Sequence, residues 1–154
     1  MNLRRLLLFA GLVVALMWTG QASARPACTA GVHATGGITY RTFCGPAHAT
    51  LHLSGKTYAF TQGECTRTGT SFTINLGTIT LPPGSPKYRY FGITVFTGRD
   101  GTFTNQAVAL QFPGGKRASL FHAKIVLKAG RSQGTFAGTT LADHIPGSGT
   151  FRCA

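Results

Sequence analysis

The sequence predicts an all-β domain, an antiparallel β-sandwich or partly closed barrel of about eight short strands with two disulfides. Three observations support this prediction. Apolar and polar residues alternate along most of the chain after Ala47, as they do in half-buried strands. Turns rich in glycine and proline separate the alternating runs. Four cysteines follow a predicted export signal, and an even number of exported cysteines is typical of disulfides.

The first 24 residues have the pattern of a cleaved signal peptide. Arg4 and Arg5 precede an apolar run over 6–17, and small residues over 22–24 form the predicted cleavage site. The apolar run covers about a dozen residues, whereas a membrane-spanning helix needs about 20. We therefore expect secretion, and no transmembrane segment after cleavage.

The remaining residues, 25–154, have the size of one ordinary domain. Residues 25–37 are small and weakly patterned, so we expect an irregular N-terminal segment held by Cys28. Lys and Arg far exceed the acids in this part of the chain, and its formal charge is about +10. The sequence predicts a single, strongly basic domain that is secreted as a monomer.

The clearest local feature is a hairpin between residues 47–53 and 56–60. Ser54 and Gly55 form a two-residue turn between the two runs. This turn places Leu51 opposite Tyr58, and two positions further along it pairs an alanine with a phenylalanine. The apolar residues of both strands then share one face, as a half-buried sheet requires.

Six further strands follow from the same alternation, separated by turn residues. The strands are predicted at 72–76, 88–96, 106–112, 118–127, 134–138 and 149–153. The turns carry Pro82-Pro83-Gly84-Ser85-Pro86, Gly98, Asp100-Gly101, Pro113-Gly114-Gly115, Gly130 and Pro146-Gly147. This strand number fits both a sandwich and a barrel, and the residue pattern alone does not choose between them.

Four cysteines, Cys28, Cys44, Cys65 and Cys153, allow three disulfide connectivities. Extending the hairpin register places Cys44 opposite Cys65, which favours that pair together with Cys28–Cys153. Against it, Pro46 interrupts the ladder, and a bridge between directly opposed strand residues has awkward geometry. The competing choice, Cys28–Cys44 with Cys65–Cys153, ties down the N-terminus and the last strand. No close C-x-x-C pair suggests zinc.

Two stretches are similar to the pattern of mycobacterial secreted lipoprotein antigens of the LpqH type. They are KTYAFTQGECTRTGTSFTINLG over 56–77 and GTFAGTTLADHIPGSGTFRC over 134–153. Those small envelope domains place one cysteine after an early hairpin and another at the end of the last strand, as Cys65 and Cys153 do here. The resemblance therefore implies a Cys65–Cys153 bridge, which leaves Cys28 to pair with Cys44. No lipobox precedes Cys28, so lipid attachment is not carried over.

Few residues are suited to catalysis. The three acids, Glu64, Asp100 and Asp143, fall in scattered predicted loops, which argues against the paired carboxylates of a glycosidase. Residues 130–134 match the G-x-S-x-G pattern, but Ser132 lies in a turn between two predicted strands. A nucleophile elbow needs a strand that leads into a helix. We therefore expect no catalytic residue here and no cofactor.

His48, His52 and His122 are expected on exposed sheet faces. His48 and His52 are four residues apart, which spans about 13 Å along a strand, so both cannot reach one ion. His122 is predicted in mid-strand beside Lys124, on a face that Val126 continues into solvent. No metal site is predicted.

The excess of basic residues is the feature that folding explains least. Five of them fall within one predicted strand and its flanking turns: Lys116, Arg117, Lys124, Lys128 and Arg131. A patch formed by these residues would attract phosphate, polysaccharide or anionic lipid, although such charge also serves solubility alone. Phe121 is the one aromatic residue among them, so the sequence has no specific nucleic-acid motif.

Two functional hypotheses follow. The first is a non-catalytic secreted or envelope-associated domain whose basic face binds an anionic polysaccharide, lipid or phosphate-bearing envelope component. The alternative is a small extracellular hydrolase such as a nuclease. That alternative needs a histidine, His48, His52 or His122, to meet Glu64 or Asp143 in a cleft.

Overall fold

The computed structural model describes residues 28–114 and 116–153, and the predicted signal peptide lies outside them. Within these two ranges the chain forms strands, and no helix is long and apolar enough to cross a membrane. The strands are β1 (Gly31–Thr35), β2 (Ile38–Phe43), β3 (His48–Leu53), β4 (Lys56–Phe60), β5 (Gly63–Arg67), β6 (Phe72–Thr80), β7 (Tyr90–Val95), β8 (Gly101–Phe112), β9 (Lys116–Lys128), β10 (Gln133–Thr140) and β11 (Pro146–Arg152).

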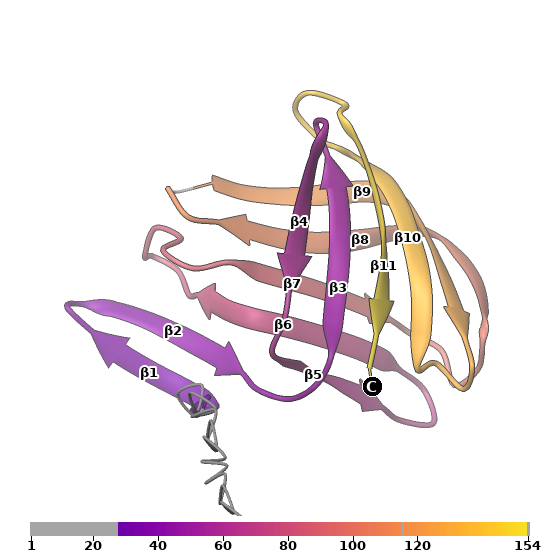
Figure 1. The fold of residues 1–154 in the computed structure, drawn as a ribbon, viewed down its shortest axis with the longest axis horizontal. Coiled ribbons are helices and arrows are strands. Elements are labelled where there is room, and N and C mark those ends of the chain that lie inside the picture. The colour runs from indigo at the N-terminus through magenta and orange to yellow at the C-terminus, as the bar shows by residue number, and fades with distance from the viewer. Residues whose placement is uncertain (1–27, 115, 154) are drawn as a thin grey trace, which may run out of the picture.

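The strands form one continuous antiparallel sheet that folds over itself. Their order is β1-β2-β6-β7-β8-β9-β10-β11-β3-β4, and β5 pairs separately with β6. In Figure 1, β3, β4 and β11 run crosswise in front of β5, β6 and β7, so the sheet makes both layers of a sandwich. The two ends of the path, β1 and β4, do not pair with each other. The predicted all-β fold is confirmed as an open sandwich, and the sheet does not close into a barrel.

The core lies between these layers and is rich in phenylalanine. Phe91 on β7 contacts Phe60 on β4 and Phe136 on β10, with ring centroids 5.4 and 5.1 Å apart. Phe72 on β6 stacks on Phe151 of β11 at 5.6 Å. All five rings are buried, which confirms that the alternation marks inward-facing positions.

The β3–β4 hairpin has the predicted register. Leu51 pairs with Tyr58 and Ala49 with Phe60. Ser54 and Gly55 both adopt positive φ, at 51° and 69°, the conformation that a two-residue turn of type I′ requires. The hairpin is therefore specified by local residues alone.

Three strands exceed the predicted number. β1 lies inside the segment 25–37, which the sequence predicts to be irregular, and this prediction is wrong for residues 31–35. The β1–β2 hairpin projects beyond the sandwich (Figure 1), and Val32 at its edge is 63% exposed. β2 was not predicted either, although Ile38 and Tyr40 alternate with the exposed Thr39 and Arg41. Phe43 is the one buried residue of the hairpin, so the hairpin lacks the run of buried apolar residues that marks the other strands. β5 was also missed, since it is short and follows β4 after only two residues.

The disulfides are Cys28–Cys44 and Cys65–Cys153, as the resemblance implies. The alternative of a Cys44–Cys65 bridge on an extended hairpin register is wrong. The ladder between β3 and β4 does not continue, because Gln62 turns the chain at a φ of 65° and β5 then pairs with β6. Two disulfides indicate an oxidising compartment.

The long strands β8 and β9 are interrupted by facing β-bulges. Asn105 and His122 have φ values of 57° and 49°, and the ladder between the strands shifts register around them. His122 Nδ1 lies 2.8 Å from Asn105 Oδ1, so the two bulges are hydrogen-bonded to each other. In β9 the inward positions change from Leu120 to Ala123 and Ile125 across the bulge. This change directs Lys124 and the later even-numbered residues outward.

Candidate anion-binding face

The five predicted basic residues do not lie on one surface, because they span the whole length of β9. Lys116 begins β9, and its side chain lies outside the described part of the structure. Arg117 donates hydrogen bonds to the carbonyl oxygens of Thr80, at 3.3 Å, and Gly84, at 2.8 Å. Arg117 therefore joins β9 to the loop that follows β6.

Arg131 lies at the other end, in the turn between β9 and β10. One terminal nitrogen of its guanidinium, Nη1, lies 2.7, 2.9 and 3.0 Å from the carbonyl oxygens of Thr68, Ser71 and Thr97. These carbonyls belong to the turns that follow β5 and β7. The Arg131 guanidinium therefore has partners within the protein, and it links its own turn to the two turns that follow β5 and β7.

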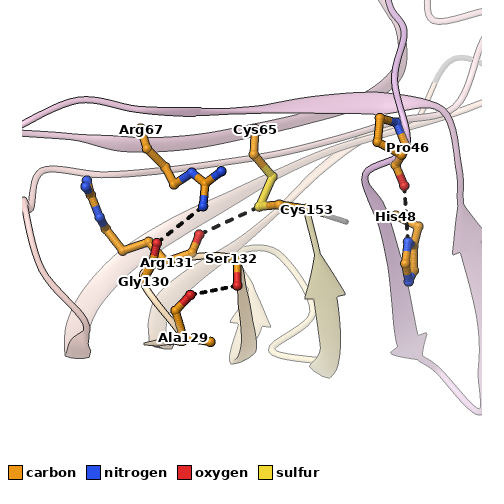
Figure 2. Close-up of a disulfide and its surroundings, with 9 residues drawn as sticks. All are labelled: Pro46, His48, Cys65, Arg67, Ala129, Gly130, Arg131, Ser132 and Cys153. Atoms are coloured by element: carbon orange, nitrogen blue, oxygen red, sulfur yellow. Dashed lines mark hydrogen bonds between the residues drawn. A yellow bond between two sulfur atoms is a disulfide. The ribbon is translucent and has the colours of Figure 1, made fainter.

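The same turn is held by further contacts beside the second disulfide. The Asp100 carboxylate accepts hydrogen bonds from the backbone nitrogens of Gly130, at 2.9 Å, and Arg131, at 2.6 Å. Arg67 donates a hydrogen bond to the Gly130 carbonyl oxygen at 3.4 Å, and Figure 2 shows Arg67 and Gly130 next to the Cys65–Cys153 bridge. We call the turns 68–71, 97–100 and 129–132, together with this bridge, the disulfide end.

Ser132 is part of the disulfide end and has a turn role, as predicted. Its hydroxyl donates to the Ala129 carbonyl oxygen at 2.7 Å (Figure 2). Asp143 and His144 follow the far end of β10, about 25 Å along the strand from Ser132. The G-x-S-x-G segment and its potential triad partners are therefore not brought together.

Lys124 and Lys128 lie instead on the outer face of the sheet, with residues from four other strands. The β9-β10-β11-β3-β4 registers place three parallel rows on this face. The rows are Lys124-Ala137-Ser148-His52-Thr57, Val126-Thr135-Thr150-Thr50-Ala59 and Lys128-Gln133-Arg152-His48. We call these three rows the basic face.

The basic face carries cations along both borders and hydroxyl groups through its middle. Lys124, Lys128 and Arg152 are exposed, and so are both histidines. Arg152 lies about 10 Å from Lys128 across β10, and the two border rows are about 13 Å apart along the strands. Shallow hollows of about 420 and 440 Å³ lie between the rows.

No acid interrupts this face. The chain has three acids in all, and they lie on β5 (Glu64), in the disulfide end (Asp100) and in the β10–β11 connection (Asp143). The positive charges of the basic face are therefore not neutralised by neighbouring carboxylates, and the face has a positive potential over two strand-crossing rows.

Comparisons with protein-family models, with curated proteins and with solved structures find no match for this chain. The functional argument therefore depends on the geometry of the basic face. Exposed cations at spacings of about 10–13 Å, with threonine hydroxyls between them, bind several separate anionic groups more readily than one small ion.

His48, His52 and His122 lie on exposed strand positions, as predicted. His48 Nδ1 is 3.3 Å from the Pro46 carbonyl oxygen (Figure 2), and His52 Nδ1 is 3.0 Å from the Thr57 hydroxyl. His122 Nδ1 contacts the side-chain amide oxygen of Asn105, so none of these three hydrogen bonds involves a carboxylate. Within residues 28–114 and 116–153, no group of three or more His, Cys, Asp and Glu side chains has a metal-binding arrangement.

Arg152 is the member of the basic face that the sequence analysis missed. It lies between the buried residues Phe151 and Cys153, so alternation in the last strand was enough to place it outward. Alternation does not predict which residues lie beside Arg152. Those neighbours depend on strand pairing, because β11 pairs with β10 on one side and, on the other, with β3, which is far away in the sequence.

Proposed function

We propose that this protein is a non-catalytic secreted or envelope-associated domain whose basic face binds an anionic polymer of the cell surface. The observation that carries the proposal is the arrangement of Lys124 and Lys128 on β9 and Arg152 on β11 on one acid-free face. The predicted signal peptide and the resemblance to envelope antigens support the same location.

The middle row favours a polysaccharide with phosphate, sulfate or carboxylate groups. Thr50, Thr135 and Thr150 place hydroxyls between the two basic borders, and these donate to and accept from sugar hydroxyls. A flat sheet surface without a deep pocket suits an extended chain. Three permanent cations predict a salt dependence with a slope of log K against log salt of about −2 to −3.

We favour binding over hydrolysis because the histidines needed for a nuclease have other partners. His48, His52 and His122 are hydrogen-bonded to a backbone carbonyl, a hydroxyl and a side-chain amide. None of these contacts activates a histidine as general base in the way that a carboxylate partner does.

The test compares two triple variants of the processed protein that lose equal charge. Lys124→Gln/Lys128→Gln/Arg152→Gln removes the cations of the basic face. Arg41→Gln/Lys87→Gln/Arg99→Gln removes three exposed cations outside it. Heparin serves as the anionic polysaccharide, and affinity is measured by calorimetry at several salt concentrations, with circular dichroism to verify folding.

We expect the first variant to lose at least about tenfold in affinity and most of the salt dependence, and the control to lose less than about threefold. An equal loss in both variants would show attraction by net charge alone and contradict the proposed face. Salt-independent binding, or no binding by the unmodified protein, would remove the proposal altogether.

A further inference from the structure

A separate hollow lies at the open edge of the sandwich, where the β3–β4 hairpin faces the ends of β8 and β9. Its volume is about 580 Å³, within the range of small-molecule sites. It is separate from the basic face, because Lys56 and Tyr58 alternate on β4 with Thr57 and Ala59 of that face. We call this hollow the edge groove.

The floor of the edge groove is aromatic and continues into the core. Tyr58 and Phe112 are both partly buried, and their ring centroids are 4.8 Å apart. Phe112 also lies 6.3 Å from Phe60, which contacts the central Phe91. Because rigid, packed rings support this floor, it offers a preformed apolar surface for a flat ring or a short chain.

The rim of the groove is charged. Lys56 on β4 and Arg89 before β7 line it from opposite layers, and both are exposed. Asp143 contributes one negative charge from the β10–β11 connection, and Thr140 a hydroxyl group. Two cations against one carboxylate leave a net positive rim, which favours an anionic head group over a cationic one.

From the aromatic floor and the cationic rim we infer that the edge groove binds a small amphipathic anion. The apolar body of this ligand lies on Tyr58 and Phe112, and its single carboxylate, sulfate or phosphate lies between Lys56 and Arg89. The inference is independent of the polymer-binding proposal, since the two sites share no side chain.

The experiment uses three probes that test the apolar body and the anionic head group of the ligand separately. They are 2-naphthoate, 2-naphthylmethylammonium and acetate. Binding to the processed protein is followed by calorimetry and by backbone amide shifts in nuclear magnetic resonance. We expect saturable binding of 2-naphthoate, with the largest shifts over 53–58, 112–118 and 140–145. The other two probes should bind at least about tenfold more weakly, because one lacks the anionic head and the other lacks the apolar body.

Matched variants test the rim. Lys56→Gln/Arg89→Gln should weaken 2-naphthoate binding about tenfold and leave 2-naphthylmethylammonium binding unchanged or stronger. Lys87→Gln/Arg99→Gln removes the same charge away from the groove and should change neither affinity. The inference is overturned if 2-naphthoate binds no better than its cationic analogue, if both double variants lose affinity equally, or if the shifts fall elsewhere.

Discussion

Lys128 and Arg131 are three positions apart in the chain, yet their charges serve different purposes. Arg131 is surrounded by three carbonyl oxygens within 3.0 Å. Lys128 is exposed at the border of the basic face, in one row with Arg152 and His48. The difference follows from the backbone around each residue. The turns around Arg131 direct three carbonyl oxygens toward its guanidinium, whereas the backbone around Lys128 is paired in the β9–β10 ladder and its ammonium group is exposed.

The two regions therefore divide the excess charge between structure and binding. At the disulfide end, charged groups are needed for the turns to keep their positions. On the basic face, the charges contribute little to the stability of the fold and are exposed to a partner. Substitutions at the disulfide end should lower stability, while substitutions on the basic face should lower affinity and leave stability nearly unchanged.

The largest loss of stability is expected from removing the Cys65–Cys153 bridge at the disulfide end. Removing Cys65–Cys153 with Cys65→Ala/Cys153→Ala frees a loop with a sequence separation of 88 and should cost about 4–5 kcal/mol of unfolding free energy. Removing Cys28–Cys44, with a separation of 16, should cost about 3 kcal/mol. Urea unfolding measures both. An equal or larger loss for the N-terminal pair would show that the β1–β2 hairpin, and not the clasp between layers, limits stability.

A smaller loss of stability is expected from Arg131→Ala, and almost none from Lys128→Ala. Arg131→Ala should lower the unfolding free energy by about 2–3 kcal/mol, because three carbonyl oxygens lose a charged donor. Lys128→Ala should change it by less than about 0.5 kcal/mol. Thermal and urea unfolding of the two variants give the comparison. If Lys128→Ala destabilises as much as Arg131→Ala, the division between structural and free charge is wrong.

The smallest change in stability is expected from a comparison of Asp100 with Asp143. Asp100→Asn should cost about 1 kcal/mol, because an amide group replaces one of the two oxygens that accept from Gly130 and Arg131. Asp143→Asn lies on the exposed β10–β11 connection and should stay within about 0.5 kcal/mol. The same unfolding assay measures both. Comparable losses would place a structural contact at Asp143 that the disulfide end does not account for.

Much of the fold follows from local pattern. The alternation from Ala47 to Leu53 and the Ser54-Gly55 turn predict the β3–β4 register residue by residue, because all the interacting groups lie within fourteen positions of each other. β1, β2 and β5 were not predicted. The β1–β2 hairpin has one buried residue, Phe43, and β5 is short and closely follows β4. The bulges at Asn105 and His122 were not predicted, although the inward positions of β9 change from Leu120 to Ala123 and Ile125 around His122.

For the candidate site too, some features follow from local pattern and others depend on strand pairing. Alternation alone determined that Lys124, Lys128, His48 and His52 point outward, since side chains on a strand change face at every residue. Only the tertiary structure decided that β11 lies between β10 and β3, which brings Arg152 and His48 into one row with Lys128. It also decided that Arg131 meets the carbonyls of two distant turns. The direction of a side chain is a local property of a strand, whereas its neighbours depend on pairing between strands that are far apart in the sequence.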